Sequence, residues 1–175
     1  MTAATLRAAT RADAPALADL ARHCFAATYA PTHEATRIGI HCDTVLADAA
    51  VATWFDDATS ALTVATRGDT LLGFVQWGPG VAPVPARQPV ELKRLYVRPD
   101  AIGGGLGQRL FDQVRDDART RGADLLWLCV YAGNMRAQRF YARQGMVPIG
   151  RVPYRFVDQV EDDLALGLRF TPAPP

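Results

Sequence analysis

The chain has 175 residues, of which 49% are apolar and 21% are charged, and its formal net charge is +1. This length suits one domain with a hydrophobic core, and the composition excludes a disordered chain. Because the net charge is close to zero, we expect neither a nucleic acid nor a membrane as partner.

The N-terminal segment and the cysteines give the expected location. The first residues lack the basic-then-apolar pattern of a signal peptide, and no apolar run reaches the ~18 residues of a membrane span. The three cysteines, Cys24, Cys42 and Cys129, are too far apart in sequence to predict a disulfide framework or a zinc site. We therefore expect a cytoplasmic protein that binds no metal.

The first part of the chain predicts one strand and two helices. A strand is expected at residues 5–9, and Asp13 is the expected N-cap of a helix that continues to about Thr28. Residues 29–41 contain a proline and a glycine and are predicted to be irregular. A second helix is expected over residues 43–55, with a buried stripe formed by Val45, Leu46, Ala49 and Ala52.

The middle of the chain predicts a hairpin, a loop and a further strand. Residues 61–66 and 71–77 have strand character and flank a turn-like segment at residues 67–70. Residues 78–89 contain four prolines and are predicted to form a loop, after which strand character resumes at residues 90–97.

The second half alternates between helix and strand patterns. An amphipathic helix is expected from about Leu106 to a stop at Gly122, and Asn134 is expected to cap another helix that ends at Gly145. The apolar run at residues 124–130 predicts a strand covered on both faces, with Cys129 in the core. The last predicted strands are residues 147–157 and 163–170. We expect one domain over residues 1–170 and a disordered tail at residues 171–175.

A glycine cluster follows the strand that leads to Pro99 and precedes a helix. Such a turn can bind a phosphate, because glycines let the backbone approach and the first helical turn offers free N–H groups. A nucleoside-triphosphate loop needs a lysine directly after its glycines, but the only lysine is Lys93. A dinucleotide fingerprint would need its third glycine at Gln108. A glycine loop without a ligand remains open on these residues alone.

Two segments together resemble one known family. Residues 95–107, Leu-Tyr-Val-Arg-Pro-Asp-Ala-Ile-Gly-Gly-Gly-Leu-Gly, are similar to a strand, a Val-x-Pro-type turn and the motif [Q/R]-x-x-G-x-[G/A]. Residues 134–146 resemble N-x-x-A-x-x-F-Y-x-x-x-G-F. Both motifs, in this order, are those of the GNAT superfamily of acyl-CoA-dependent N-acetyltransferases. The chain departs from the family pattern at Ile102, where the family has Gln or Arg.

The resemblance implies an α+β fold with a mostly antiparallel sheet of six to seven strands. The sheet is expected to splay between its fourth and fifth strands, with about four helices around it. Acetyl-CoA is the implied cosubstrate, and it would lie at this splay. The implied cofactor-binding residues are Leu95, Tyr96, Val97, Ile102, Gly103, Gly104, Gly105, Leu106, Gly107, Gln108, Asn134 and Tyr141.

The resemblance also implies direct attack of an amine on the thioester in a ternary complex. Tyr141 matches the general-acid tyrosine of the family, and the N–H of Val97 is a candidate donor to the oxyanion. An alkyl amine is protonated at neutral pH and must lose a proton before it attacks. Glu91 is the candidate base, and a solvated or arginine-paired glutamate is the alternative. Some relatives carry an acid at the position of Cys129, which a thiol cannot replace as a base.

The acceptor is expected to be a primary amine of a small molecule or a peptide. A weak similarity to polyamine acetyltransferases directs attention to four carboxylates, Glu34, Glu91, Asp158 and Glu161. Further candidate contacts to the acceptor are Phe25, Tyr29, His33, His41, Trp77 and Tyr154, together with Glu34 and Asp158 named above. For each of these residues, packing or a surface position is the competing explanation.

Two other functions stay open on the sequence. A non-catalytic acyl-CoA sensor would keep the glycine loop and lack a working base. A protein N-terminal or lysine acetyltransferase would use the same chemistry on a peptide. The expected assembly is a monomer or a homodimer.

Overall fold

The computed structural model describes residues 4–170, which form five α-helices and a mixed sheet of seven strands. The strand order is β1-β2-β3-β4-β5-β7-β6. The elements are β1 (Thr5–Ala8), α1 (Ala14–Tyr29), α2 (Ala35–Thr44), α3 (Asp48–Ala52), β2 (Ala61–Arg67), β3 (Thr70–Pro79), β4 (Pro89–Val97), α4 (Leu106–Thr120), β5 (Leu125–Val130), α5 (Met135–Arg143), β6 (Val147–Phe156) and β7 (Gln159–Arg169). The expected α+β class with up to seven strands is confirmed.

The chain divides into two compact units. The first contains the residues up to Gln76 together with Arg94–Gln113, and the second contains Trp77–Lys93 together with the residues from Val114 onward. The chain passes from one unit to the other within β3, β4 and α4. The expected disordered tail at residues 171–175 lies outside the described residues, and the assignment of residues 1–170 to one domain stays a prediction.

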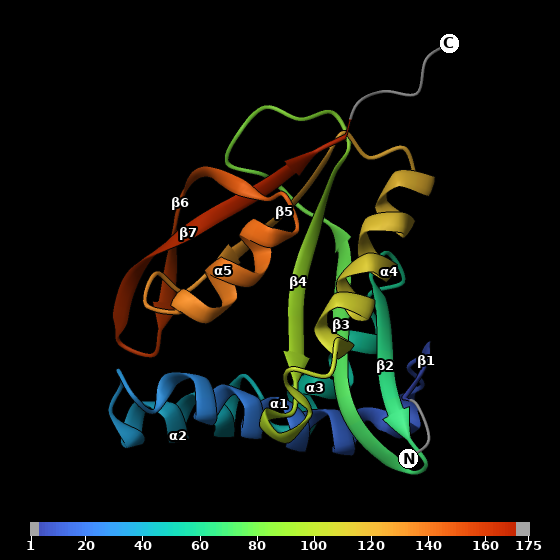
Figure 1. Ribbon diagram of the computed structural model, residues 1–175. Coiled ribbons are helices and arrows are strands. Elements are labelled where there is room, and N and C mark those ends of the chain that lie inside the picture. The colour runs from blue at the N-terminus through green and yellow to red at the C-terminus, as the bar shows by residue number, and fades with distance from the viewer. Residues whose placement is uncertain (1–3, 171–175) are drawn as a thin grey trace. The chain divides into compact units, whose positions relative to one another are not determined.

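The first unit packs α1, α2 and α3 together beside the strands β1 and β2 (Figure 1). Helix α1 buries residues at steps of three and four, among them Leu17, Leu20, Cys24 and Phe25, so its apolar face matches the helical period. Strand β1 pairs antiparallel with β2, from Thr5 opposite Thr66 to Ala8 opposite Thr63. Both the strand and the first helix are confirmed close to their expected bounds.

Helix α2 corrects the expectation that residues 29–41 are irregular. The segment buries Ile38, His41 and Cys42 on one face of the helix, and this packing outweighs the unfavourable helix propensity of Gly39. The expected single helix over residues 43–55 is wrong, because α2 ends at Thr44 and α3 covers only Asp48–Ala52. In the stripe predicted there, Leu46 is buried, but Val45 is 44% exposed.

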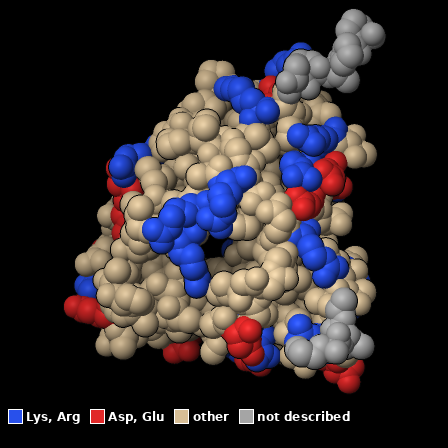
Figure 2. Space-filling model, viewed as in Figure 1, with Lys and Arg blue, Asp and Glu red and all other residues tan. Residues whose placement is uncertain are grey.

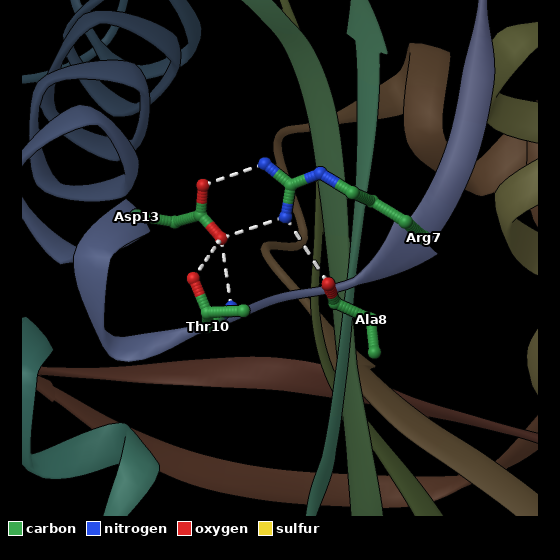
Figure 3. A network of polar contacts seen from close by, with 4 residues as sticks. All are labelled: Arg7, Ala8, Thr10 and Asp13. Carbon is green, nitrogen blue, oxygen red and sulfur yellow. Dashed lines mark hydrogen bonds and ion pairs between the residues drawn. The ribbon is translucent and has the colours of Figure 1, made fainter.

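A polar network connects β1 to the start of α1 (Figure 3). The guanidinium group of Arg7 donates to both carboxylate oxygens of Asp13, at 2.8 and 2.7 Å. The main-chain N–H and the hydroxyl of Thr10 donate to Oδ2 of Asp13 at 2.7 and 3.1 Å. Asp13 is at the N-cap position of α1, as expected, but its side chain does not cap that helix. It instead anchors the preceding turn to the sheet.

The second unit is built on β5, β7 and β6, in which β6 and β7 form a long antiparallel hairpin (Figure 1). Strand β7 begins at Gln159, four residues before its expected start, because Gln159–Asp162 pair with Pro153–Phe156 across the turn. The loop at residues 80–88 packs on this sheet. Its alanines and valine, Ala82, Val84 and Ala86, contact a buried cluster of Leu125, Trp127 and Ala165.

The ladder between β4 and β5 is parallel and short. It pairs Pro89 with Leu125, Val90 with Leu126 and Glu91 with Trp127. Within residues 4–170 no further pair follows Glu91, although β5 continues to Val130. Backbone groups beyond that point need other partners, which is the condition for a ligand that extends the sheet.

Candidate active site

The glycine turn between β4 and α4 has the backbone geometry expected of a phosphate loop. Gly103 and Gly105 have φ values of 91° and 77°, in the left-handed region that glycine tolerates best. A Cβ built on either residue would meet nothing within 4 Å, so the space beside the loop is open. Helix α4 begins directly after the turn, at Leu106, and has no acidic residue in its first turn to repel an anion.

The side chains around this turn are engaged with protein partners. Arg98 donates to both carboxylate oxygens of Asp100 at 3.0 and 2.7 Å, and the amide of Gln108 donates to Asp112 at 2.9 Å. Arg109 donates to the carbonyl of Ala4 at 2.8 Å. All of these hydrogen bonds are formed within the protein. An anion at the turn would therefore be held chiefly by main-chain N–H groups.

Ile102 and the end of β4 complete the first half of the candidate site. Ile102 is 43% exposed at the start of the turn, where a Gln or Arg was expected from the family pattern. The ring of Tyr96 packs edge-on against Phe74 at 5.3 Å, and the thiol of Cys24 donates to the carbonyl of Val97 at 3.4 Å. These contacts hold the end of β4 in place. Its main chain is the candidate hydrogen-bonding partner of the cofactor.

Helix α5, in the second unit, presents Asn134 and Tyr141. Oδ1 of Asn134 accepts a hydrogen bond from the N–H of Ala137 at 3.0 Å, which confirms Asn134 as the cap. Because Oδ1 caps the helix, contact with a cofactor would fall to the Nδ2 group. Tyr141 is 7% exposed and packs edge-on against Phe140, with ring centroids 5.1 Å apart. The ring of Tyr141 is therefore packed in the interior of its unit, and its role as general acid stays a prediction.

Glu91 lies half-buried at the end of the short β4–β5 ladder. The backbone of Gly80 passes so close that a Cβ added there would lie 2.5 Å from both Cβ and Oε2 of Glu91. Only glycine allows this approach, so the loop after β3 confines the Glu91 side chain. Its candidate role as base stays a prediction.

The expectation that Cys129 is a core residue is wrong. Cys129 is exposed, although its neighbours Leu128 and Val130 are buried. Partial burial of the thiol and the carboxylates of Glu91 and Asp163 raise the pKa of Cys129 to about 11. The group is therefore a protonated thiol at neutral pH and is no base.

Asp163 is a carboxylate that the sequence did not single out. It is only 4% exposed, on β7, and acts electrostatically on Cys129. A charged residue near the start of an apolar strand resembles an ordinary surface position, so no sequence signal distinguished it. Its burial depends on the strands around it.

The other acceptor candidates separate into packing residues and surface residues. Phe25 and His41 are buried and stack at 4.1 Å, and burial and the charge of Arg94 lower the pKa of His41. Trp77 is 3% exposed and its indole N–H donates to Asp117 at 2.6 Å. These three side chains are buried packing residues. The remaining candidates, in surface or half-buried positions, are Tyr29, His33, Glu34, Tyr154 and Asp158.

The outer face of α5 is basic. Figure 2 shows basic side chains gathered over this helix, which carries the exposed residues Arg136, Arg139 and Arg143. No acidic residue occurs between Asp124 and Asp158. Among the described residues, 4–170, no helix has the length and hydropathy of a membrane span. The same residues contain no group of three or more His, Cys, Asp or Glu side chains that could hold a metal ion.

Comparison with known proteins agrees with these two half-sites. The sequence profile described as "Acetyltransferase (GNAT) family" matches residues 15–146. An uncharacterized N-acetyltransferase of Mycobacterium tuberculosis is 30% identical over 154 residues, which cover 88% of this chain and 96% of that protein. The profile match includes both the glycine turn and α5.

Solved structures share the fold. The PaiA N-acetyltransferase of Thermoplasma acidophilum, in complex with coenzyme A, superposes with a TM-score of 0.76 at 18% identity and covers 97% of this chain and 100% of its own. YncA of Salmonella typhimurium, with its cofactor acetyl-CoA, has a TM-score of 0.70 at 22% identity and covers 96% and 94%. The family profile, the long relative and the fold agree, and the chain belongs to the GNAT acetyltransferase family.

Proposed function

We propose that the protein transfers an acetyl group from acetyl-CoA to a primary amine of a small molecule or a peptide. The single observation that carries the proposal is the glycine turn. Its positive φ values at Gly103 and Gly105, and the helix that starts at Leu106, are the backbone features of turns that bind anions, and the chain belongs to an acetyltransferase family. Acetyl-CoA carries the pyrophosphate that such a turn binds.

The cofactor would be held mainly by backbone groups. The pyrophosphate would accept hydrogen bonds from the N–H groups of residues 103–108, and the pantetheine arm would pair with the main chain of Leu95 and Val97. The Nδ2 group of Asn134 would donate to the same arm. The engaged side chains of Arg98, Gln108 and Arg109 support this main-chain mode.

The reaction would proceed by direct attack in a ternary complex. The acceptor enters as an ammonium ion, and Glu91 takes one proton from it directly or through water. The nitrogen lone pair then bonds to the thioester carbon, and the N–H of Val97 donates to the oxyanion that forms.

Collapse of the intermediate breaks the C–S bond. The sulfur leaves with the bonding electrons and takes a proton from the phenol of Tyr141. The nitrogen then loses its second proton, and water carries that proton to the phenolate of Tyr141. The products are the N-acetyl amine, coenzyme A with a free thiol, and one proton released to solvent.

A CoA-release screen tests the proposal. The protein is incubated with acetyl-CoA and, in separate wells, polyamines, amino acids, aminoglycosides and peptides. We expect amine-dependent release of free thiol together with acetylated acceptor detected by mass. Acetyl-CoA binding without acetylation of any amine would instead identify an acyl-CoA sensor, and acetylation of peptides alone would identify a protein acetyltransferase.

A further inference from the structure

The guanidinium group of Arg94 is held by two neighbours in the first unit. Its Nη1 donates to Oε1 of Gln76 on β3 at 2.6 Å, and its Cζ lies 4.2 Å from the centroid of the Trp54 ring. Gln76 is 3% exposed, whereas Arg94 and Trp54 are half-buried. An amide and an aromatic ring orient the guanidinium group, and both are neutral, so these two contacts leave its charge in place.

Arg94 lies on the part of β4 that is proposed to hold the cofactor. The ladder between β4 and β5 ends at Glu91, and Arg94 directly precedes Leu95, whose main chain is a proposed partner of the pantetheine arm. Glu91 and Lys93, the other charged residues of β4, lie at odd positions and point to the other face of the strand. A group bound at Arg94 would therefore lie beside the stretch that carries the thioester.

Strand β3 shows which face of the sheet Arg94 occupies. A Cβ built on Gly73 would lie 3.2 Å from the side chain of Leu110, so Gly73 faces α4. Gln76 is three residues further along the strand and points to the opposite face, where it contacts Arg94. The pyrophosphate would bind at the start of α4. Arg94 therefore faces away from the helix that would hold the cofactor phosphates, on the side left for the acceptor.

The charge of Arg94 acts among neutral rings. His41 on α2 is buried, and burial followed by the charge of Arg94 lowers the pKa of its imidazole. The His41 ring is therefore neutral at pH 7, and it stacks on Phe25 at 4.1 Å. On the same helix, Arg37 forms an ion pair with Glu34 at 2.9 Å, and this pair adds no net charge. In surroundings less polar than water, a fixed cation attracts an anion more strongly.

We propose that the guanidinium group of Arg94 binds the carboxylate of the acceptor, and that the acceptor is therefore an amino acid. The inference rests on the proposed function for the amine. A guanidinium group donates two parallel hydrogen bonds to a carboxylate, a pairing that an ammonium group does not reproduce. A polyamine has only cationic groups and would be repelled by Arg94.

Calorimetric titration of the CoA-saturated protein tests the proposal without turnover. The probes are the common L-amino acids and, for each one that binds, the amide with the same side chain. We expect at least one amino acid to bind. Its amide keeps the amine and lacks the carboxylate, so it should bind about 10- to 100-fold more weakly. Binding of no amino acid, or equal affinity for an amino acid and its amide, would overturn the proposal.

Two variants and a matched control test the residue. Arg94→Met removes the guanidinium group and should weaken amino-acid binding by about 10- to 100-fold, with unchanged affinity for the amide. Arg22→Met is the control, because Arg22 is also a half-buried arginine of the first unit and donates to the carbonyl of Leu46 at 2.9 Å. If Arg94→Met fails to fold, Gln76→Glu decides, since its carboxylate would pair with Arg94 and compete with the ligand. Unchanged amino-acid affinity in the folded variant would overturn the proposal.

The imidazole of His41 reports on the occupation of Arg94. Its pKa, measured by NMR, should rise in Arg94→Met, because a nearby cation disfavours the imidazolium form. A bound amino acid should also raise this pKa in the wild-type protein, since the carboxylate offsets the guanidinium charge, and the amide should not. An unchanged pKa of His41 on amino-acid binding would mean that the carboxylate binds elsewhere and would overturn the proposal.

The inference and the proposed function can fail separately. Amino-acid binding that depends on Arg94, without acetyl transfer, would support this inference and contradict the proposed function. Acetyl transfer with equal KM for an amino acid and its amide, in both the wild-type and the Arg94→Met protein, would do the reverse.

Discussion

At the scale of single residues, the proposed general-acid role of the Tyr141 phenol is the most directly testable. The side chain is almost fully buried and its ring packs against Phe140, so replacement of the hydroxyl leaves the packing in place. We predict that Tyr141→Phe lowers kcat by ~100-fold, the usual scale of lost general-acid catalysis, with unchanged acetyl-CoA affinity. Steady-state kinetics and calorimetry measure the two quantities.

Tyr131→Phe serves as the control for this prediction. Tyr131 precedes α5, and its ring lies against Gly133, so the same chemical change is made nearby without touching the proposed acid. Unchanged turnover in Tyr141→Phe would remove the phenol from the mechanism.

Asp13 links pH to stability. Its hydrogen bonds with Arg7, followed by those from Thr10, hold the pKa of the Asp13 carboxyl well below its usual range. The stabilisation is therefore complete above the unfolded pKa, near ~4, and is lost as the pH falls toward the folded pKa. We predict that Asp13→Asn lowers the free energy of unfolding by roughly 1 kcal/mol at pH 7.

Urea unfolding at pH 7 and pH 3 measures this effect, and the difference between wild type and variant should shrink at the lower pH. Asp56→Asn is the control, because Asp56 forms an ion pair with Arg11 in which both side chains are about 60% exposed. Such a pair contributes little. A constant difference at both pH values would contradict the assigned role of Asp13.

The residue scale also shows where sequence reasoning stops. Asn134 could be predicted as a cap because its role depends on the three residues that follow it. Cys129 and Asp163 could not, because their exposure depends on which strand lies beside them. Cys129 is in an apolar run and is exposed, whereas Asp163 is charged and is buried.

At the scale of elements, the turn from β4 to α4 is the most sharply testable. Alanine at Gly105 would have to adopt a φ of 77°, which costs ~1–3 kcal/mol and would shift the N–H groups of the loop. We predict that Gly105→Ala weakens acetyl-CoA binding by about tenfold. Calorimetry measures the affinity for acetyl-CoA. Urea unfolding measures how much the substitution lowers the free energy of unfolding of the whole protein.

Gly39→Ala is the matched control for the loop. Gly39 is inside α2, and an added Cβ there meets nothing within 4 Å, so alanine should stabilise the protein by ~0.5–1 kcal/mol and leave acetyl-CoA binding unchanged. Wild-type affinity in Gly105→Ala would mean that this turn does not hold the cofactor.

The elements differ in how well their sequences predict them. The β2–β3 hairpin, α4 and α5 have strong periodicity and clear stop signals, and they were predicted within a few residues. The sequence does not predict helix α2, because Gly39 and Pro31 are local signals against a helix. Its stability comes from the buried face of Ile38, His41 and Cys42, which is a property of the packed unit.

At the scale of the whole molecule, two short motifs are enough to predict the fold class. The first specifies a strand, a turn and a helix start, and the second specifies a capped helix that ends at a glycine. The family assignment follows from the profile match and the long relative. The acceptor could not be predicted in the same way. The guanidinium group of Arg94 on β4 is held by Gln76 on β3 and by Trp54 after α3, and no single segment of sequence contains these three residues.

The central claim is that the protein transfers acetyl groups to an amine in a ternary complex, and initial velocities test it most directly. Rates of CoA release are measured over a matrix of acetyl-CoA and amine concentrations, with the acetylated amine quantified by mass. The account predicts intersecting reciprocal plots and one acetylated amine for each CoA released. Parallel plots, or CoA release without acetylated amine, would contradict it.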